Sequence, residues 1–459
     1  YTPIFDGQSV FSIGCLAMDP NNSNVLWVGT GENNSQRNLA YGDGVYKTTD
    51  GGKTFTNMGL KTSSQIGKIM IDPRNSNVVY VASQGQAWGP GGERGLYKTT
   101  DGGRSWDRIL EIGEYTGVSD MEMDPRTPDS LYAASHQRER RVWSKIDGGP
   151  ESAIYKSEDA GATWKKLNKG LPKGDVGRIG LALSPANPDI LYAVIELPGN
   201  KGGFYRSTDL GESWEKRSNK VSSSPQYYNE VYADPHNQDR VILMDTRNGL
   251  SDDGGATWEN IEGRNKHVDN HAMWINPDDT NHYLMGCDGG LYETYDRGET
   301  WQFQSNLPIT QYYHVRTDND YPFYNVYGGT QDNGSWFGPH QTHRRNLVNA
   351  DWTYTIGGDG YLSLPDPDRP NISYAESQYC GLRRYDRTTG NSISIKPQPT
   401  EDEEFRWNWN TPYFISNFDS KTLYVGGNYV FKSTDMGLSL IHISEPTRPT
   451  RASRMPSSA

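Results

Sequence analysis

A ten-residue motif recurs along this chain and restricts its fold more than any other feature. "YKTTDGGKTF" begins at Tyr46, "YKTTDGGRSW" begins at Tyr97, and five further variants follow. The common core is Ser/Thr-x-Asp-x-Gly-x-Thr/Ser-aromatic, although the last copy, "FKSTDMGLSL", lacks the aromatic residue. The first six copies are about 43 to 58 residues apart, a period typical of propeller blades. The motif aspartates are Asp50, Asp101, Asp159, Asp209, Asp253, Asp296 and Asp435.

Each position of the motif has a physical reason that predicts a tight turn between two strands. The aspartate accepts hydrogen bonds from nearby backbone N–H groups and from a Ser/Thr hydroxyl. A glycine such as Gly52 adopts backbone angles that a Cβ atom opposes, and the final aromatic residue packs back onto the hairpin. We therefore interpret the seven aspartates as structural residues at hairpin corners and not as catalysts.

A second repeat precedes each motif. Segments such as "MDPNNSNVLWVG" from Met18 and "IDPRNSNVVYVA" from Ile71 join two short apolar strands through a Pro-Asn turn. One unit thus reads strand, Pro-Asn turn, strand, variable loop, strand, Asp turn, strand, and about nine units are visible. Because neighbouring units must complete each other's core, the predicted fold class is all-β, a β-propeller of four-stranded antiparallel blades.

The repeats continue without a clean linker, so two arrangements stay open. Residues 1–310 form the first, Asp-turn-rich blades, and residues 311–437 either close that propeller or start a second one. We favour a seven- or eight-bladed propeller followed by the start of another. The alternative is a single ring of about ten blades.

Both ends of the chain depart from the repeat. Tyr1 occupies the place of a motif aromatic residue, so we expect the sequence to begin within a blade. After Gly437 the chain reads "LSLIHISEPTRPTRASRMPSSA", which resembles a translated sequencing-library adapter. We therefore predict that residues 438–459 are a non-native, disordered tail.

Several stretches resemble a known family. "YTPIFDGQSV", "GGERGLYKTTDGG", "DNHAMW", "LPITQYYHV" and "YNVYGGTQDNGS" are similar to Asp-box (bacterial neuraminidase repeat) propellers of the sortilin N-terminal type, and above all to bacterial proteins called glycosyl hydrolases. Xyloglucanases with paired propellers carry the same repeats. The resemblance covers about Tyr1 to Gly437. It implies a secreted, periplasmic or cell-surface protein that acts on or binds glycans.

The composition excludes several classes of function. A net charge of −12 leaves no basic surface for a general nucleic-acid binder. No stretch approaches the roughly 20 apolar residues of a membrane helix. The three cysteines, Cys15, Cys287 and Cys380, have no motif spacing, so neither a disulfide framework nor a zinc site is predicted. We expect no nucleic-acid partner, no membrane segment and no cofactor.

The order of the strands assigns the connections to two faces of the propeller. In a four-stranded meander the first and third turns share one face, where the Pro-Asn and Asp turns lie. The second and fourth connections share the opposite face, which we call the loop face. The variable loops are all of this second kind, so function is expected there.

Four aspartates in these loops are candidate catalysts. A glycosidase needs two carboxyl groups on either side of the scissile bond, roughly 5 to 9.5 Å apart, and Glu32 lies on the same face. The competing interpretation is that Asp-Gly and Asp-Asn pairs form ordinary turns. The candidates are Asp269, Asp288, Asp332 and Asp359.

Alternating side chains in "HVDNH" raise the alternative of a metal site. His267, Asp269 and His271 would lie on one side of an entering strand and, with Asp288, would hold a divalent cation. We prefer to interpret His271 as a hydrogen-bonded, ligand-binding residue, and we predict no metal.

Tryptophans and arginines are interleaved in the same loops. Aromatic faces flanked by polar groups suit sugar or peptide binding, although such rings also pack between blades. Together with His271, the predicted ligand-binding residues are Trp88, Arg138, Arg141, Trp143, Trp336, Trp407 and Trp409.

These features predict a glycoside-hydrolase-like propeller that acts on or binds glycans. They exclude a sialidase, which needs an arginine cluster for a carboxylate and a tyrosine nucleophile, because the Arg-Ile-Pro signature ahead of the motifs is absent. Two alternatives stay open. One is a non-catalytic, sortilin-like propeller that binds a peptide or protein, and the other is an assembly scaffold.

Overall fold

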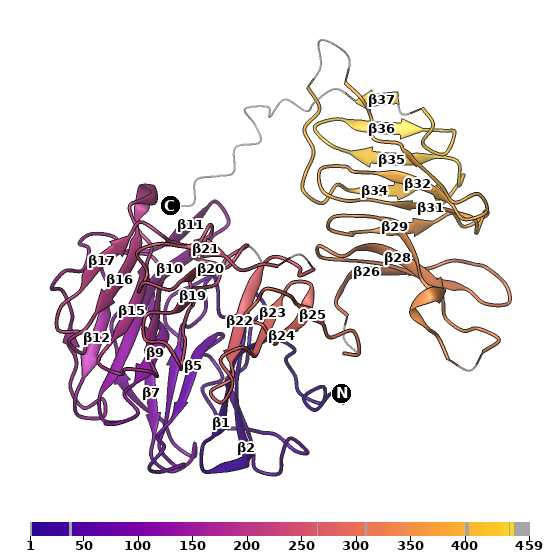
Figure 1. The fold of residues 1–459 in the computed structure, drawn as a ribbon. Helices are drawn as coiled ribbons and strands as arrows, with labels where there is room; N and C mark the ends of the chain where they lie inside the picture. The colour runs from indigo at the N-terminus through magenta and orange to yellow at the C-terminus, as the bar shows by residue number, and fades with distance from the viewer. Residues whose placement is uncertain are drawn as a thin grey trace. The chain divides into compact units, whose positions relative to one another are not determined.

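The computed structural model describes residues 2–35, 39–263, 265–307, 310–344, 346–399 and 404–439, and the backbone of 441–444. The chain divides into two compact units, unit 1 (Tyr1–Pro308) and unit 2 (Ile309–Ala459). In Figure 1 unit 1 runs from indigo to red and unit 2 from orange to yellow. Each unit is described by itself.

Unit 1 contains six antiparallel sheets within its described residues, which we number blades 1 to 6 (Figure 1). Blade 3 carries a fifth strand, β11, paired with β10, and a short 3₁₀ helix, η1 (Pro198–Asn200), lies in blade 4. The strands of blades 1 to 3 are β1 (Ile13–Asp19), β2 (Asn22–Thr30), β3 (Val45–Thr48), β4 (Thr56–Asn57), β5 (Ile66–Ile71), β6 (Val79–Ser83), β7 (Gly95–Thr99), β8 (Asp107–Leu110), β9 (Thr116–Met123), β10 (Leu131–Arg141), β11 (Ser144–Asp147), β12 (Ile154–Ser157) and β13 (Lys165–Lys166). Those of blades 4 to 6 are β14 (Ile179–Leu183), β15 (Leu191–Ile195), β16 (Gly203–Ser207), β17 (Glu215–Ser218), β18 (Val231–Ala233), β19 (Val241–Leu243), β20 (Gly249–Ser251), β21 (Glu259–Asn260), β22 (Asn270–Ile275), β23 (Tyr283–Cys287), β24 (Gly290–Thr294) and β25 (Gln302–Phe303).

The blades of unit 1 are arranged radially through their first strands. β1 packs beside β5, β5 beside β9, β9 beside β14, and β14 beside β18. Apart from β11, which pairs with β10 outside this order, the strands of each sheet follow chain order and pair antiparallel with their neighbours. The predicted fold class, an all-β propeller of four-stranded antiparallel blades, is confirmed.

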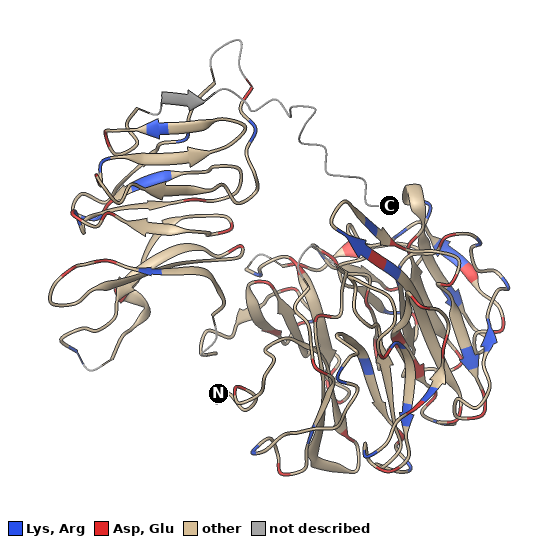
Figure 2. Cartoon of the chain, turned by 180° about the vertical axis from the view of Figure 1, so that it is seen from behind, with Lys and Arg blue, Asp and Glu red and all other residues tan. Residues whose placement is uncertain are grey.

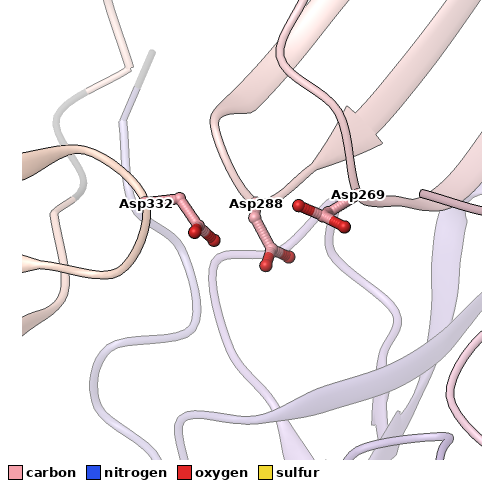
Figure 3. Close-up of side chains that lie close together, drawn as sticks. All are labelled: Asp269, Asp288 and Asp332. Atoms are coloured by element: carbon pink, nitrogen blue, oxygen red, sulfur yellow. The ribbon is translucent and has the colours of Figure 1, made fainter. Parts of the chain in front are cut away.

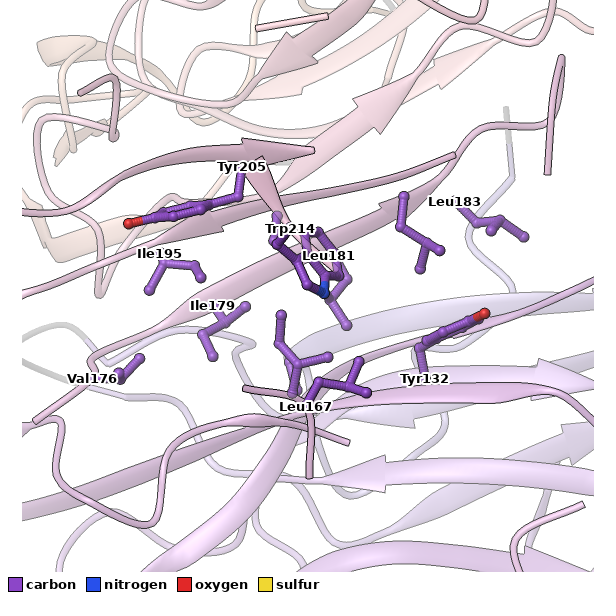
Figure 4. Packing of buried hydrophobic residues seen from close by; sticks show 13 residues of the cluster. Tyr132, Leu167, Val176, Ile179, Leu181, Leu183, Ile195, Tyr205 and Trp214 are labelled. Atoms are coloured by element: carbon purple, nitrogen blue, oxygen red, sulfur yellow. The ribbon is translucent and has the colours of Figure 1, made fainter. Parts of the chain in front are cut away.

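The core of unit 1 lies between neighbouring blades. Figure 4 shows one such layer, a cluster that contains Tyr132 of β10, Leu181 of β14, Tyr205 of β16 and the Asp-turn residue Trp214. These side chains alternate with residues that face the adjoining blade, as the period of two in a strand requires. Burying each large apolar side chain contributes about 1.5–3 kcal/mol, so blade-to-blade contact supplies most of the stability.

The Asp turns have a uniform geometry. Asp50 Oδ1 accepts hydrogen bonds from the backbone N–H groups of Lys53 (3.0 Å) and Thr54 (2.9 Å), and Oδ2 accepts one from the Thr54 hydroxyl (2.7 Å). Gly52, at φ 88°, donates its N–H to Thr48 Oγ1 at 3.0 Å. The bonds to the fourth residue after the aspartate recur at Asp101, Asp159, Asp209, Asp253, Asp296 and Asp435.

Hydrogen bonds join the Asp turn to the Pro-Asn turn of the same blade. The N–H of Gly51 donates to the carbonyl of Asn24, and that of Gly102 donates to the carbonyl of Asn77, both at 3.0 Å. These two turn types therefore share one face of each blade. The connections between the second and third strands, and those between blades, lie at the opposite end.

Side chains of one blade also reach the Asp turn of the next blade. Lys98 Nζ of blade 2 donates to the carbonyl of Ala160 in blade 3 at 2.9 Å. The Tyr132 hydroxyl of blade 3 donates to the carbonyl of Leu210 in blade 4 at 2.9 Å. Carbonyl groups of the Asp turn thus accept hydrogen bonds from side chains of the preceding blade. These bonds help to hold neighbouring blades together.

Unit 2 contains three further four-stranded sheets within its described residues, blades 7 to 9 (Figure 1). Their core includes Tyr374, Leu382, Leu423 and Phe431. One 3₁₀ helix, η2 (Asn349–Asp351), precedes β29. The strands are β26 (Tyr312–Thr317), β27 (Asn325–Thr330), β28 (Gly334–Pro339), β29 (Thr353–Ile356), β30 (Ser363–Pro365), β31 (Ile372–Ala375), β32 (Arg383–Asp386), β33 (Asn391–Ser394), β34 (Tyr413–Ile415), β35 (Leu423–Gly426), β36 (Val430–Ser433) and β37 (Ile441–Ser444).

Part of the segment expected to be disordered is a strand. β37, within residues 438–459, pairs antiparallel with β36 and is the fourth strand of blade 9. A short apolar-polar alternation after an Asp turn is sufficient for this pairing. Leu440 and residues 445–459 lie outside the described residues. Among the residues that are described, no helix is long and apolar enough to span a membrane.

Candidate functional site

Two of the predicted catalytic aspartates lie together on the loop face of unit 1 (Figure 3). Asp269 precedes β22, and Asp288 lies in the turn between β23 and β24. The N–H of Asp288 donates to the carbonyl of Asp269 at 3.1 Å. Carboxylate oxygens of the two residues lie within 4.8 Å of each other. The turn geometry therefore brings two anionic groups to one point of blade 6.

Asp269 is held by its neighbours in a special backbone conformation. Its φ of 64° is in the left-handed region, which a residue adopts only when its surroundings compensate the strain. The N–H of Asp269 donates to the carbonyl of Thr246 at 2.9 Å, and the Tyr228 hydroxyl donates to Asp269 Oδ1 at 2.5 Å. The carboxylate is thus oriented by blade 5.

A buried polar network anchors the segment that carries Asp269. The Lys266 side chain is fully buried, and its Nζ lies 3.2 Å from Glu262 Oε2. The Asn270 amide donates to Glu262 Oε1 at 2.9 Å and to the carbonyl of Asp245 at 3.1 Å. Because every partner is buried, this network fixes the approach to β22 on the loop face.

His271 links Asp288 to two aromatic rings. Its Nε2 donates to Asp288 Oδ1 at 2.9 Å. Its ring stacks on Tyr228 at 5.3 Å between centroids and meets Tyr227 edge-on at 4.7 Å. His267 instead donates Nδ1–H to the carbonyl of Val268 at 2.8 Å. Within the described part of unit 1, His267, Asp269 and His271 do not form a three-ligand metal group.

Glu32 belongs to the same electrostatic environment, although it comes from blade 1. Burial raises the pKa of Glu32; the negative charge of Asp288 raises this pKa further, and His271 lowers it. The site therefore contains a carboxyl group with a raised pKa in the same environment as aspartates that accept hydrogen bonds. Carboxyl groups with perturbed pKa values are common at acid–base sites.

In unit 2, Asp359 is a structural acceptor. It is 4% exposed and accepts hydrogen bonds from the Tyr361 hydroxyl (2.8 Å), the Trp409 indole N–H (3.0 Å) and the Asp332 N–H (2.9 Å). Asp332 itself adopts a left-handed φ of 57°. Three donors thus occupy the Asp359 carboxylate, which orients the Asp332 turn and the Trp409 loop.

Glu376, in the loop after β31, is a functional candidate that the sequence did not indicate. It is fully buried, and burial raises its pKa to about 8. Oε1 accepts the N–H of Thr411 at 3.0 Å, while Oε2 has no hydrogen-bond partner among the described residues. From sequence alone, a glutamate in a loop is expected to be exposed to solvent. Its burial results from tertiary packing, which the sequence pattern does not show.

The predicted ligand-binding residues of unit 1 occupy very different surroundings. Trp143 is 78% exposed at the tip of the β10–β11 hairpin, whose alternating charges are visible in Figure 2. Trp88 is also exposed, and the Arg140 guanidinium lies 5.7 Å from its ring centre. Arg141 pairs with Glu139 on the hairpin surface. Arg138 differs from these residues, because it is only 1% exposed and binds main-chain carbonyls.

The predicted tryptophans of unit 2 pack at its loops. Trp409 meets Tyr379 edge-on at 5.0 Å, in addition to its bond with Asp359. Trp336 donates its indole N–H to the carbonyl of Asn333 at 2.8 Å. Trp407 packs against Phe431, at 5.3 Å between ring centres, so part of its surface belongs to the core of blade 9.

Comparison with known proteins finds sequence similarity to xyloglucanases. No family model matches it. A xyloglucanase of Paenibacillus sp is 25% identical over 230 residues, which are 48% of this chain and 19% of that protein. The xyloglucanase Xgh74A of Acetivibrio thermocellus is 25% identical over 267 residues, which are 50% of this chain and 31% of that protein. The chain therefore spans less than a third of each of these relatives.

A solved structure supports the fold. PorZ, a surface component of the type-IX secretion system of Porphyromonas gingivalis, matches with a TM-score of 0.51 at 13% sequence identity. The match covers 96% of this chain and 54% of that structure. At this identity the similarity concerns the fold alone.

Proposed function

We propose that this protein is a glycoside hydrolase of the xyloglucanase type, with the loop face of unit 1 as its catalytic surface. The observation that carries the proposal is the group formed by Glu32, Asp269 and Asp288, whose carboxyl groups share one electrostatic environment and differ in their hydrogen-bond partners. The similarity to xyloglucanases supports a glycan substrate. We assign the repeats to the Asp-box class and the protein to the cell exterior as part of this proposal.

Each carboxyl group has a role in the proposed reaction. Glu32 acts as the general acid that passes a proton to the departing glycosidic oxygen, a role that the direction of its pKa shift, upward through burial, supports. Asp288, bonded to His271, accepts the proton of the water that attacks the anomeric carbon. Asp269, oriented by Tyr228, stabilises the positive charge that develops on the sugar ring. Asp332 stays a predicted catalytic residue of unit 2, and Asp359 orients its loops.

Exposed tryptophans would bind the glycan chain. Sugar rings stack on aromatic faces, and the exposed rings of Trp88 and Trp143 offer such faces on unit 1. In unit 2 the partly buried Trp336 and Trp409 offer smaller faces beside polar loops. We keep these four residues, together with Trp407 and Arg141, as the proposed ligand-binding set.

The decisive experiment is hydrolysis of xyloglucan and a panel of other polysaccharides, measured as released reducing ends. We expect Glu32→Gln and Asp288→Asn to lower kcat by about 10²–10⁴-fold, the usual contribution of a general acid or base. Asp107→Asn is the matched control, because it removes an exposed carboxylate on β8 outside the loop face. Thermal unfolding of every variant separates lost catalysis from lost folding.

Two results would contradict the hydrolase proposal. One is a wild-type protein that cleaves no glycan of the panel, and the other is a pair of carboxylate variants with unchanged kcat. Glycan binding without turnover, measured by calorimetry and abolished by Trp143→Ala, would instead support the non-catalytic alternative.

A further inference from the structure

The segment 31–35, which carries Glu32, joins blade 1 to three other blades. The N–H of Ser35 donates to the carbonyl of Gln226, ahead of blade 5, at 2.8 Å. The Asn33 amide donates to the carbonyl of Gly67 in blade 2 at 3.2 Å, and the Ser35 hydroxyl donates to Asp147 of blade 3. The loop that follows β2 is therefore held by hydrogen bonds to three other blades on the loop face of unit 1.

The start of this segment is sterically restricted. Gly31 has a φ of 89°, and a Cβ atom at this position would lie 2.0 Å from the carbonyl oxygen of Ser64. The N–H of Gly31 donates to the carbonyl of Ser12 at 2.9 Å. Only glycine fits this close approach, so the direction in which the segment leaves β2 is set by backbone packing.

Arg138 of β10 holds the middle of the segment. Its Nη1 donates to the carbonyl of Asn34 at 2.7 Å, and its Nη2 donates to the carbonyl of Gly85 in blade 2 at 2.8 Å. The same Nη2 donates to the Gln65 side chain. One guanidinium thus connects blade 3, blade 2 and the segment from blade 1.

Two further arginines extend this connection. Arg140, also on β10, donates to the carbonyl of Ser35 at 3.3 Å. Arg178, which is 3% exposed, donates to the carbonyls of Gln226 and Tyr227 at 3.4 and 3.3 Å. Buried arginines rather than apolar contacts therefore hold this part of the loop face together.

The bonding of Arg138 is unusual for a buried cation. Among the described residues it forms no ion pair, since its donors end on two carbonyls and one amide oxygen. Burial, with the nearby positive charge of Arg94, lowers its pKa to about 9. Burying an unpaired charge costs stability, and an apolar residue of similar size would avoid this cost. A buried arginine at this position has a physical reason if its hydrogen bonds hold the segment 31–35 in one conformation.

We infer that Arg138 is a positioning residue, which fixes the segment 31–35 and with it the place of Glu32 on the loop face of unit 1. The effect of Arg138 on catalysis rests on the proposed function. Its effect on the position of the segment 31–35 does not depend on that function. It assigns to Arg138 a role different from the direct ligand contact predicted from the sequence.

The test compares wild type with Arg138→Met and Arg138→Lys. The Met side chain keeps much of the apolar volume and loses all hydrogen bonds, whereas Lys keeps the charge and part of the bonding. In Arg138→Met we expect faster hydrogen exchange at residues 33–35, and a Glu32 pKa that falls toward the ordinary value of 4.5. The exchange is read by mass spectrometry and the pKa by carboxyl-carbon NMR.

Kinetics give a second readout. We expect Arg138→Met to lower kcat by about tenfold to a hundredfold, as a displaced catalytic group does, and to move the alkaline limb of the pH profile to lower pH. KM should change little, and Arg138→Lys should recover part of the loss. Arg108→Met is the control, because Arg108 pairs with exposed Glu111 on the outer strand β8.

The outcomes separate the two proposals. If the wild type shows no hydrolysis but Arg138→Met still accelerates exchange and lowers the Glu32 pKa, positioning stands and the hydrolase proposal fails. If exchange and the Glu32 pKa are unchanged in a folded Arg138→Met, the positioning inference is wrong, whatever the activity. If Arg138→Met unfolds, Arg138→Lys carries the same comparison.

Discussion

At the scale of single residues, carboxyl groups of the same chemistry behave differently because their surroundings differ. Asp359 accepts three hydrogen bonds. Glu376 in unit 2 accepts one N–H and is fully buried, so its pKa rises to about 8. Burial also raises the pKa of Glu32, and the negative charge of Asp288 raises it further. Burial is thus the largest cause of the raised pKa of both glutamates.

Glu376 gives a stability prediction with a defined sign. Its folded pKa of about 8 is above the ordinary 4.5, so the folded state binds more protons than the unfolded state between these values. Stability of unit 2 should therefore fall as pH rises from about 4.5 to about 8. Glu376→Gln should remove this fall and stabilise the protein at pH 8 by about 3–5 kcal/mol. Native-state hydrogen exchange at β31 measures the effect.

The control for this prediction is Glu404→Gln, which makes the same change at an exposed glutamate of unit 2. It should leave the pH dependence of β31 exchange unaltered. A Glu376→Gln variant whose β31 amides keep the wild-type pH dependence would contradict the assignment, because another group would then cause it.

At the scale of elements, the blade order depends on aromatic residues of the second strand. Tyr132 is fully buried, packs in the layer between blades 3 and 4, and donates its hydroxyl to the carbonyl of Leu210. Its ring and its hydroxyl therefore make separable contributions. The ring buries apolar area against the next blade, while the hydroxyl binds the carbonyl that the Asp turn presents.

We expect the ring of Tyr132 to contribute more to the free energy of unfolding than its hydroxyl. Tyr132→Phe should cost about 1 kcal/mol, the net value of one hydrogen bond. Tyr132→Ala should cost about 3–5 kcal/mol, because it leaves a cavity between two blades. Urea unfolding measures both. Tyr295→Phe, in which the ring is 60% exposed, is the control with almost no effect, and equal losses for the two Tyr132 variants would refute this division.

At the scale of the whole molecule, local patterns predicted the blades, and long-range contacts determined the site. The Asp turn depends on side chains within five positions of the aspartate, so a short motif predicts it. Arg138 was predicted to bind ligand, yet it binds carbonyls of residues 53 and 104 positions away. Carbonyl oxygens are common to every residue, so no sequence pattern identifies such partners. The position of the segment 31–35, which carries Glu32, depends on the radial order of blades in the same way.

The seven Asp turns make one prediction for the entire chain. Hydrogen bonds from the turn hold the pKa of Asp159 at about 2, and the same cause acts on Asp253, Asp296 and Asp435. A lowered folded pKa contributes stability that is complete above about pH 4, the ordinary value, and is lost as pH falls toward 2. We therefore expect the thermal midpoint to drop steeply between pH 4 and pH 2, measured by circular dichroism.

Salt distinguishes this mechanism from acid loss of ion pairs. The donors to the turn aspartates are backbone N–H groups and hydroxyls, which carry no net charge. Screening weakens interactions between exposed charges and not such local hydrogen bonds, so the acid transition should keep its midpoint between low and molar salt. Asp296→Asn should lower the midpoint at pH 6 and reduce the further loss at pH 3. A transition that moves with ionic strength, or an unchanged acid loss in Asp296→Asn, would assign acid sensitivity to other groups.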